Sequence, residues 1–178
     1  IDKPFLPDKP SIAVLPFDNM SGDPEQEYFS DGIAEDIITD LSKASQLLVI
    51  ARNSSFAYKG QSPDIRKVCR ELGVKYVLEG SVRRSGNRVR INAQLINGID
   101  GGHIWADRYD RDLSDIFALQ DEITTTIVGA IAPEIDSADM RRTHSKPTEN
   151  MDAWDCVLRA HALSNQTSVD NLKQGHNL

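Results

Sequence analysis

The stretch VKYVLEGSVRRSGNRVRINAQLI, residues 74–96, contains two strand-like runs separated by a short polar segment. Between residues 88 and 95, apolar side chains alternate with Arg, Asn and Gln, which is the pattern of a strand with one buried face. The intervening Ser85, Gly86 and Asn87 are small residues that tolerate the positive φ of a tight turn. This stretch therefore predicts a β-hairpin.

Two strand and helix pairs are predicted before the hairpin. SIAVLPF at 11–17 and LLVIA at 47–51 are short apolar runs of the kind found in strands covered on both faces. Amphipathic helical patterns follow them. The first begins at Ile33. The second begins at Ser62, Pro63 and Asp64, which supply a capping side chain, a first-turn proline and a carboxylate near the positive end of the helix dipole, and it should stop at Gly73. This alternation implies parallel strands joined by right-handed crossovers.

After the hairpin, HIWADRY at 103–109 predicts another strand of an antiparallel meander, and a helix from about Leu113 should end or kink at Pro133. The expected fold class is α/β, with a small mixed sheet of about five strands, elements in the order β-α-β-α-β-β-β-α, and helices packed on the sheet. We expect a C-terminal helical segment as well. The predicted divisions are a linker at 1–10, the α/β domain at 11–135, a second linker at 136–150 and the helical region at 151–178.

The overall charge of the chain disfavours two classes of partner. The 178 residues carry 20 Lys and Arg against 27 Asp and Glu, a formal net charge of -7. Nucleic acids and anionic membranes are bound chiefly by basic surfaces. No apolar run approaches the roughly 18 residues of a membrane span. We therefore predict neither nucleic-acid binding nor membrane insertion by these residues.

The segment between the first strand and the first helix contains Asp18, Asn19, Ser21 and Asp31, all oxygen donors. Their spacing does not match a calcium-binding loop, and the segment lacks the Lys and the glycine density of a phosphate loop. One interpretation is a turn leading to a helix capped by Ser30 or Asp31. The other is a crevice for a ligand or partner at the carboxyl end of a parallel strand.

Arg83, Arg84, Arg88 and Arg90 form the basic cluster of the hairpin. They could bind an anionic ligand or an acidic partner, or they could be the solvated face of an exposed strand. The four histidines and two cysteines show no metal-ligand spacing, and no nucleophile or phosphate-loop motif is present. The sequence thus predicts no metal, no cofactor and no catalytic residue in this chain.

Four separated runs resemble one family. KPSIAVLPFDNMSGDPEQEYFSDGIAEDIITDLSK, LLVIARNSSFAYKG, ELGVKYVLEGSVRRSGNRVRINAQLI and GGHIWADRYDRDLSDIFALQDEI look like the TolB amino-terminal-like domain of bacterial signalling proteins. The resemblance covers roughly residues 9 to 135. ENMDAWDCVLRAHAL, within 149–163, is similar to the opening helix of tetratricopeptide repeats.

This resemblance implies a non-catalytic regulatory or protein-interaction module, most simply the sensory part of a class III adenylate cyclase. Family members commonly lie between a membrane segment and tetratricopeptide repeats, with an upstream cyclase or winged-helix DNA-binding domain. TolB binds other envelope proteins, which favours protein partners. The alternatives are a small-molecule sensor domain and the sensor of a membrane-tethered winged-helix regulator. An upstream membrane span would place the domain in the periplasm, and otherwise we expect it in the cytoplasm.

Overall fold

The computed structural model describes residues 9–145 and 156–160. The chain divides into two compact units, Pro10–Ile135 and a second unit formed by Ile1–Lys9 with Asp136–Leu178. Within the described residues, no helix combines the length and the apolar composition needed to cross a membrane.

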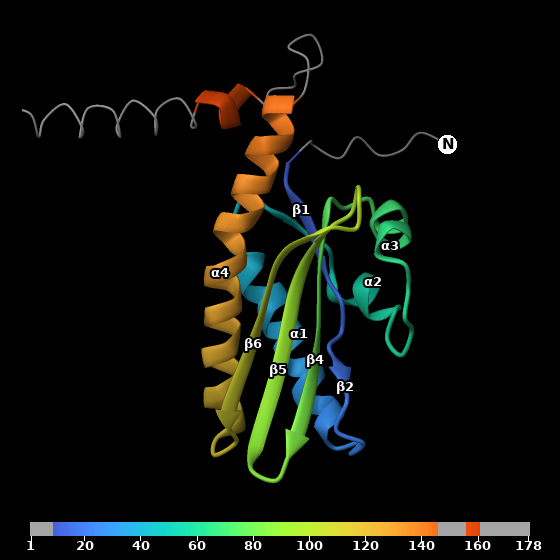
Figure 1. The fold of residues 1–178 in the computed structure, drawn as a ribbon, viewed down its shortest axis with the longest axis vertical. Helices are drawn as coiled ribbons and strands as arrows, with labels where there is room; N and C mark the ends of the chain where they lie inside the picture. The colour runs from blue at the N-terminus through green and yellow to red at the C-terminus, as the bar shows by residue number, and fades with distance from the viewer. Residues whose placement is uncertain (1–8, 146–155, 161–178) are drawn as a thin grey trace, which may run out of the picture. The chain divides into compact units, whose positions relative to one another are not determined.

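The first unit is built on one mixed sheet (Figure 1). Its main strand order is β3-β1-β4-β5-β6, with β2 pairing on β4 beyond the end of β1. Pairing of β1 with β3 and with β4 is parallel, whereas β4, β5 and β6 form an antiparallel meander. The strands are β1 (Ser11–Val14), β2 (Asp18–Asn19), β3 (Leu48–Val49), β4 (Tyr76–Ser85), β5 (Arg88–Asn97) and β6 (His103–Asp112).

The predicted α/β fold class is confirmed. The hairpin turns at Gly86, whose φ of 59° is accessible to glycine without strain. The strand not predicted is β2, which comprises two residues and is separated from β1 by Pro16. Because proline has no amide N–H, pairing with β4 is interrupted there and resumes at Asp18.

Helices occupy both faces of the sheet: α1 (Gln26–Leu41), α2 (Arg52–Phe56), α3 (Ile65–Leu72) and α4 (Ile116–Ser145). The predicted end of α3 at Gly73 is confirmed, with φ 68°. The predicted cap is displaced, because Asp64 rather than Ser62 is the N-cap and accepts the Arg66 N–H at 2.9 Å. The predicted cap of α1 at Ser30 or Asp31 is wrong. That helix begins at Gln26 with Glu25 as its N-cap, which is more than one turn earlier.

The main core lies between the sheet and the helices α1 and α4. Leu78 and Val82 of β4 point into it and are fully buried, as are Ile33 and Ile37 of α1. Ile123 of α4 joins them. In Figure 1, α1 lies behind the strands.

A smaller core lies on the opposite face of the sheet, under α3. Val77 points to this face because successive strand residues alternate, and it packs with Val68 and Cys69 of α3. Burial raises the pKa of the Cys69 thiol to about 11. This cover reaches only the start of β4, so the following side chains Glu79, Ser81 and Arg83 remain partly or fully exposed. One part of the sheet is thus left without a helix over it.

Helix α4 continues through Pro133 to Ser145. Of the two predicted outcomes, an end or a kink at this proline, the end is therefore wrong. An internal proline removes one backbone hydrogen bond, the one to the carbonyl four residues earlier. The apolar stripe of Ile127, Ile131 and Ile135 runs through this position, and all three side chains are buried. Burial of that stripe outweighs the lost hydrogen bond.

In the second unit, the described residues 136–145 and 156–160 are helical. The predicted linker at 136–150 is therefore helical in its first part, and the rest lies outside the described residues, as does most of the predicted repeat start at 151–178. Asp139 is completely buried and accepts a hydrogen bond from Arg142 at 3.4 Å. Arg159 donates to the Thr143 carbonyl at 3.1 Å. The domain boundaries stay a prediction.

Candidate functional site

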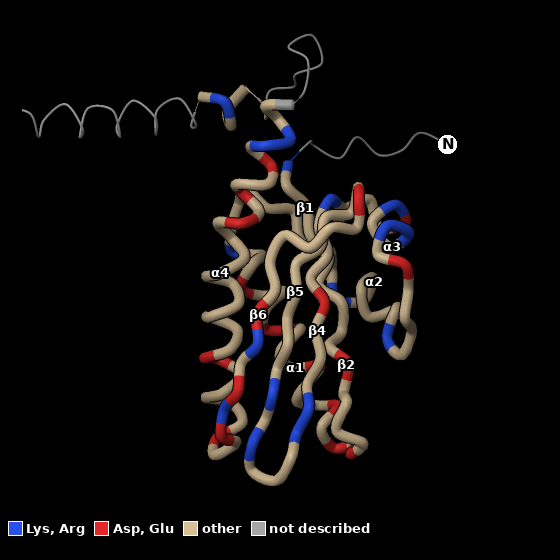
Figure 2. Tube along the Cα trace, viewed as in Figure 1, with Lys and Arg blue, Asp and Glu red and all other residues tan. Residues whose placement is uncertain are grey.

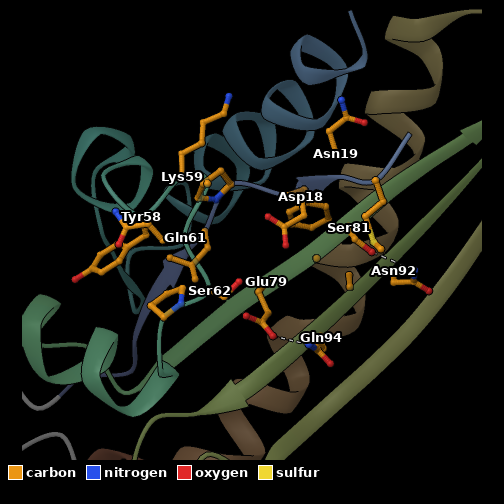
Figure 3. A pocket seen from close by; sticks show the side chains of 18 of the residues that line it. Asp18, Asn19, Tyr58, Lys59, Gln61, Ser62, Glu79, Ser81, Asn92 and Gln94 are labelled. Carbon is orange, nitrogen blue, oxygen red and sulfur yellow. Dashed lines mark hydrogen bonds between the residues drawn. The ribbon is translucent and has the colours of Figure 1, made fainter. Parts of the chain in front are cut away.

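An open groove of about 1080 Å³ lies over the uncovered part of the sheet (Figure 3). Its floor is formed by β4, β5 and β6, and one wall is the loop between α2 and α3. The junction between β1 and β2 forms the opposite rim. All of these segments belong to the first unit.

The floor carries two cross-strand pairs of polar side chains. Gln94 donates to the Glu79 carboxylate at 2.5 Å, and Asn92 donates to the Ser81 hydroxyl at 3.3 Å. The register of β4 with β5 places Glu79 opposite Gln94 and Ser81 opposite Asn92, so both pairs face the groove. Because each pair combines donors and acceptors, the floor can bind groups of either kind.

The wall is held to α1 by Lys59. Its ammonium group lies 3.2 Å from Glu27 and also donates a hydrogen bond to Asp31. Burial by itself lowers the pKa of Lys59, but the hydrogen bonds to Asp31 and Glu27 outweigh this effect and raise the pKa above its usual value. Gly60 follows with φ 74° and lets the chain turn back toward α3. The pair with Asp31 thus fixes the position of the groove wall.

Tyr58 attaches the same loop to α3. Its hydroxyl donates to the Glu71 carboxylate, and this bond raises the pKa of Tyr58 to about 12. The tyrosine therefore stays protonated throughout the physiological range, as the hydrogen bond requires. With Lys59 on one side and Tyr58 on the other, the loop has a side-chain anchor to each neighbouring helix.

The opposite rim is ordered by its own polar groups. Asn19 accepts the Ser21 N–H at 3.0 Å and donates to the Asp23 carbonyl at 2.7 Å. Ser21 in turn accepts the Arg84 N–H at 2.9 Å, which attaches the rim to β4. The turn interpretation of this segment therefore describes most of its hydrogen bonding. Asp18 and Asn19 nevertheless line the groove, as the crevice interpretation expects.

A second, smaller hollow of about 320 Å³ lies at the far end of the same face. It is lined by Arg83, Arg88 and Arg90 with Asp110, and Figure 2 shows basic residues gathered toward this tip of the hairpin. Arg90 binds Asp110 through two contacts, 2.7 and 3.0 Å, and this bond lowers the pKa of the Asp110 carboxyl. Arg84 lies outside this hollow, and its Nε donates to the Gly86 carbonyl at 2.9 Å.

The eight predicted site residues are therefore distributed over several places. Asp18 and Asn19 line the groove, Ser21 and Asp31 support its two sides, three of the arginines share the smaller hollow, and Arg84 belongs to neither. Their roles in binding stay a prediction. The predictions missed the groove floor, the residues Glu79, Ser81, Asn92 and Gln94. The alternation of polar residues along β5 is the sequence signal for two of these four, Asn92 and Gln94.

The groove presents hydrogen-bonding side chains to solvent. Polar side chains, including the carboxylate of Glu79 and the amide of Gln94, face a broad open space. Across residues 9–145 and 156–160, no group of three or more His, Cys, Asp or Glu side chains is placed to hold a metal ion. The arrangement can supply several hydrogen bonds to a polar molecule.

Comparison with known proteins identifies one curated relative of high similarity. It is named "Putative adenylate cyclase 3" and comes from Rhizobium meliloti (strain 1021). The two sequences are 67% identical over 157 residues, which is 88% of this chain and 27% of the relative. The chain thus spans about a quarter of the length of the curated relative that it matches. The predicted link to adenylate cyclases is thus confirmed as sequence similarity to a relative that bears this name.

Solved structures with similar backbones include a bacterial lipoprotein. Lipoprotein GNA1162 from Neisseria meningitidis matches with a TM-score of 0.50 and 20% identity, over 68% of this chain and 96% of that one. This likeness concerns the fold alone. TolB from Acinetobacter baumannii matches with a TM-score of 0.49 and 18% identity, over 70% of this chain and 29% of that one.

The family model that matches carries a different description from the TolB-like domain predicted above. It is described as "HilA/YgeH-like transcriptional regulator, second domain", and it covers residues 8–126, more than half of the chain. That range includes all six strands and the helices α1 to α3. The chain therefore belongs to the family of HilA/YgeH-like transcriptional regulator second domains.

Proposed function

We propose that this chain is a non-catalytic regulatory module of a larger signal-transduction protein, and that the groove binds the small polar molecule to which the module responds. The observation that carries this proposal is the polar floor of the groove. Glu79, Ser81, Asn92 and Gln94 lie on a part of the sheet that no helix covers, and anchored segments flank them on both sides.

The size and chemistry of the groove favour a ligand with several hydroxyl or amide groups. Ligand sites usually have volumes of about 300–1,000 Å³ and a few convergent polar groups, and the volume of this open groove is slightly above that range. The floor offers carboxylate, amide and hydroxyl groups, which suit a polyhydroxylated or zwitterionic molecule better than a polyanion. The net charge of -7 also works against polyanions.

The relatives suggest the kind of output that such a module controls. One is named as an adenylate cyclase, whereas the family description names transcriptional regulators. The same module attached to different output domains would account for both names. For this chain we propose a cyclase output, because the relative at 67% identity bears that name. We also propose that 11–135 is the regulatory domain and that 151–178 begins a tetratricopeptide region.

The first test is a thermal-shift screen of the 178-residue chain with monosaccharides, polyols and amino acids. A ligand at 100 times its dissociation constant stabilises a protein by about 2.7 kcal/mol, or roughly 5–10 °C for a chain of this size. The shift should disappear in a Glu79→Ala, Gln94→Ala double variant. It should persist in Arg88→Ala, a matched control on the same sheet face but in the other hollow.

The second test concerns regulation. In the Rhizobium meliloti relative, the matching region is replaced by this chain, and cyclic AMP production is measured with and without the compound found in the screen. We expect the compound to change the rate of the chimera, and the double variant to abolish that response. Cyclic AMP synthesis from ATP by the 178-residue chain alone would contradict the proposal. So would a chimera whose rate responds equally with and without the floor side chains.

A further inference from the structure

Strand β6 forms one edge of the sheet and presents it to solvent. Nine of its ten residues pair with β5 on one side, and among the described strands none pairs with the other side (Figure 1). Ala106, Asp107 and Arg108 along this edge are exposed. A long open edge with unpaired backbone groups is a template for another strand.

The hydrogen-bonding pattern shows which backbone groups of β6 face outward. Leu113 donates its N–H to the Asn87 carbonyl at 2.7 Å, so residue 113 faces β5. Since direction alternates along an antiparallel pair, residues 111, 109 and 107 face β5, and residues 112, 110, 108 and 106 face away. Any strand added to this edge must pair through that outward set.

Two of the outward groups are bound by side chains of their own neighbours. The Arg108 N–H donates to the Asp107 carboxylate at 2.8 Å. The Asp110 carbonyl accepts from the Arg111 guanidinium at 3.0 Å. Both bonds satisfy an edge group for which no other strand is present. Adding a strand to this edge would therefore break two bonds, one made by the acidic side chain of Asp107 and one made by the basic side chain of Arg111.

The charges around Tyr109 are self-complementary. The run Asp107, Arg108, Tyr109, Asp110, Arg111 changes sign when it is read backward. If two copies pair antiparallel with Tyr109 opposite Tyr109, Arg108 lies opposite Asp110 and Asp107 lies opposite Arg111. Opposite charges at directly paired positions stabilise a sheet, and like charges destabilise it.

Neighbouring registers lack this complementarity. The outward set permits only shifts that again place outward residues opposite each other. The nearest such registers each place one pair of like charges face to face: two arginines in the register centred on Arg108, and two aspartates in the register centred on Asp110. In the register centred on Asp110, Arg108 also lies opposite Asp112, so only the register centred on Tyr109 combines opposite charges with no like-charge pair. The register centred on Tyr109 is therefore selected by charge.

We propose that two copies of this chain form a dimer by antiparallel pairing of their β6 strands, centred on Tyr109. In this dimer the Arg108 N–H meets the Asp110 carbonyl of the other copy, and residues 106 to 112 of the two strands form about eight backbone hydrogen bonds. Asp107 and Arg111 then lie opposite each other across the interface, and Arg111 keeps the bond from its Nε to Glu122 at 2.6 Å. Asp110 keeps its bond to Arg90 and gains Arg108 of the second copy on its other side.

The competing interpretation is that the same charges protect the edge and keep the chain monomeric. Exchange of charges between two variants separates the interpretations. Arg108→Glu places Glu opposite Asp110 at both ends of its own dimer, and Asp110→Lys places Lys opposite Arg108. In a mixture, the heterodimer restores opposite charges in both pairs.

The experiment is sedimentation equilibrium of the 178-residue chain, of each variant and of their equimolar mixture, at low salt. We expect a dimer for the wild type, at least about tenfold weaker association for each variant alone, and recovered association in the mixture. Lys67→Glu, a charge reversal on the exposed face of α3, is the control and should behave as the wild type.

Three results would overturn the proposal. The first is a wild type that remains monomeric up to about 0.5 mM, a concentration at which even weak dimers associate. The others are variants that associate as strongly as the wild type, and a mixture that associates no more strongly than its components. Far-ultraviolet circular dichroism verifies that each variant is folded. If a variant does not fold, the salt dependence of wild-type dimerisation decides, because pairing through these charges must weaken between about 20 and 500 mM salt. The proposal does not depend on the function of the groove.

Discussion

Gly80 occupies a position on β4 where the main core has no room for a side chain. A Cβ atom at this residue would lie 2.4 Å from the Asn92 carbonyl oxygen and 2.5 and 2.7 Å from two ring atoms of Phe17. Phe17 is 1% exposed, so its ring cannot move into solvent. The carbonyl belongs to the neighbouring strand β5 and is held by the sheet. Gly80→Ala therefore forces a shift of the core or of the groove floor.

The magnitude follows from two opposing effects. Overpacking a well-packed core costs about 1–3 kcal/mol, and we take about 2–3 kcal/mol here because neither neighbour can yield easily. Replacing a glycine within a strand by alanine recovers about 0.5–1 kcal/mol of backbone entropy. The net loss in the free energy of unfolding is about 1–2.5 kcal/mol. For a urea m-value of about 2 kcal/mol/M, the unfolding midpoint falls by roughly 0.5–1.2 M.

The assay is urea unfolding followed by far-ultraviolet circular dichroism, with Gly129→Ala as the matched control. Gly129 is exposed on α4 and has no atom within 4 Å of its added Cβ, so the same substitution should stabilise the chain by about 0.5–1 kcal/mol. Adding Phe17→Leu to Gly80→Ala should recover part of the loss attributable to the ring contacts. A Gly80→Ala midpoint equal to or above that of the wild type would refute the reasoning.

Two further predictions concern titratable groups. Hydrogen bonds from the side chain and then from the N–H of Arg66 lower the pKa of Asp64 at the start of α3. The stability that Asp64 contributes is therefore complete above the ordinary aspartate pKa of about 4. It is lost as the pH falls through the lowered pKa of the folded state. Asp64→Ala should lower the urea midpoint at pH 7, and the difference from the wild type should shrink toward pH 2; a difference independent of pH would contradict this assignment. Cys69 is buried with its pKa raised to about 11, whereas Cys156 is exposed, so iodoacetamide at pH 8 should modify the native chain at Cys156 and modify both thiols in urea. Peptide mass spectrometry locates the adducts, and rapid labelling of Cys69 in the native chain would show that the α3 core is open.

Local signals predicted the elements that depend on local chemistry. The end of α3 at Gly73 and the hairpin turn at Gly86 are where the residues indicate, and the start of α3 lies within two residues of the predicted cap, because capping and turn geometry are decided within a few residues. The helix boundaries that failed depend on packing at a distance. Helix α4 passes Pro133 because its isoleucine stripe remains buried, which no local propensity reports.

The candidate site was predicted only in its rim. Asp18 and Asn19 are predicted candidates because they are oxygen donors that follow a parallel strand, and both line the groove. The floor pair of Glu79 and Gln94 lies on two strands, and the prediction from the sequence assigned a candidate role only to the arginines of the hairpin. Lys59 is 28 positions from Asp31, and a separation of that kind carries no sequence signal.

The sequence by itself determined the α/β class, the order of the main strands and helices, and the acidic charge, because periodicity and composition report the local burial of each segment. Only the tertiary structure decided which surfaces stay open. Helix α3 covers the start of β4 and leaves its polar continuation bare as the floor of a groove, and the strand order leaves β6 at the edge. Both features depend on contacts between residues far apart in the chain, whose free energies are set by long-range packing rather than by local preference.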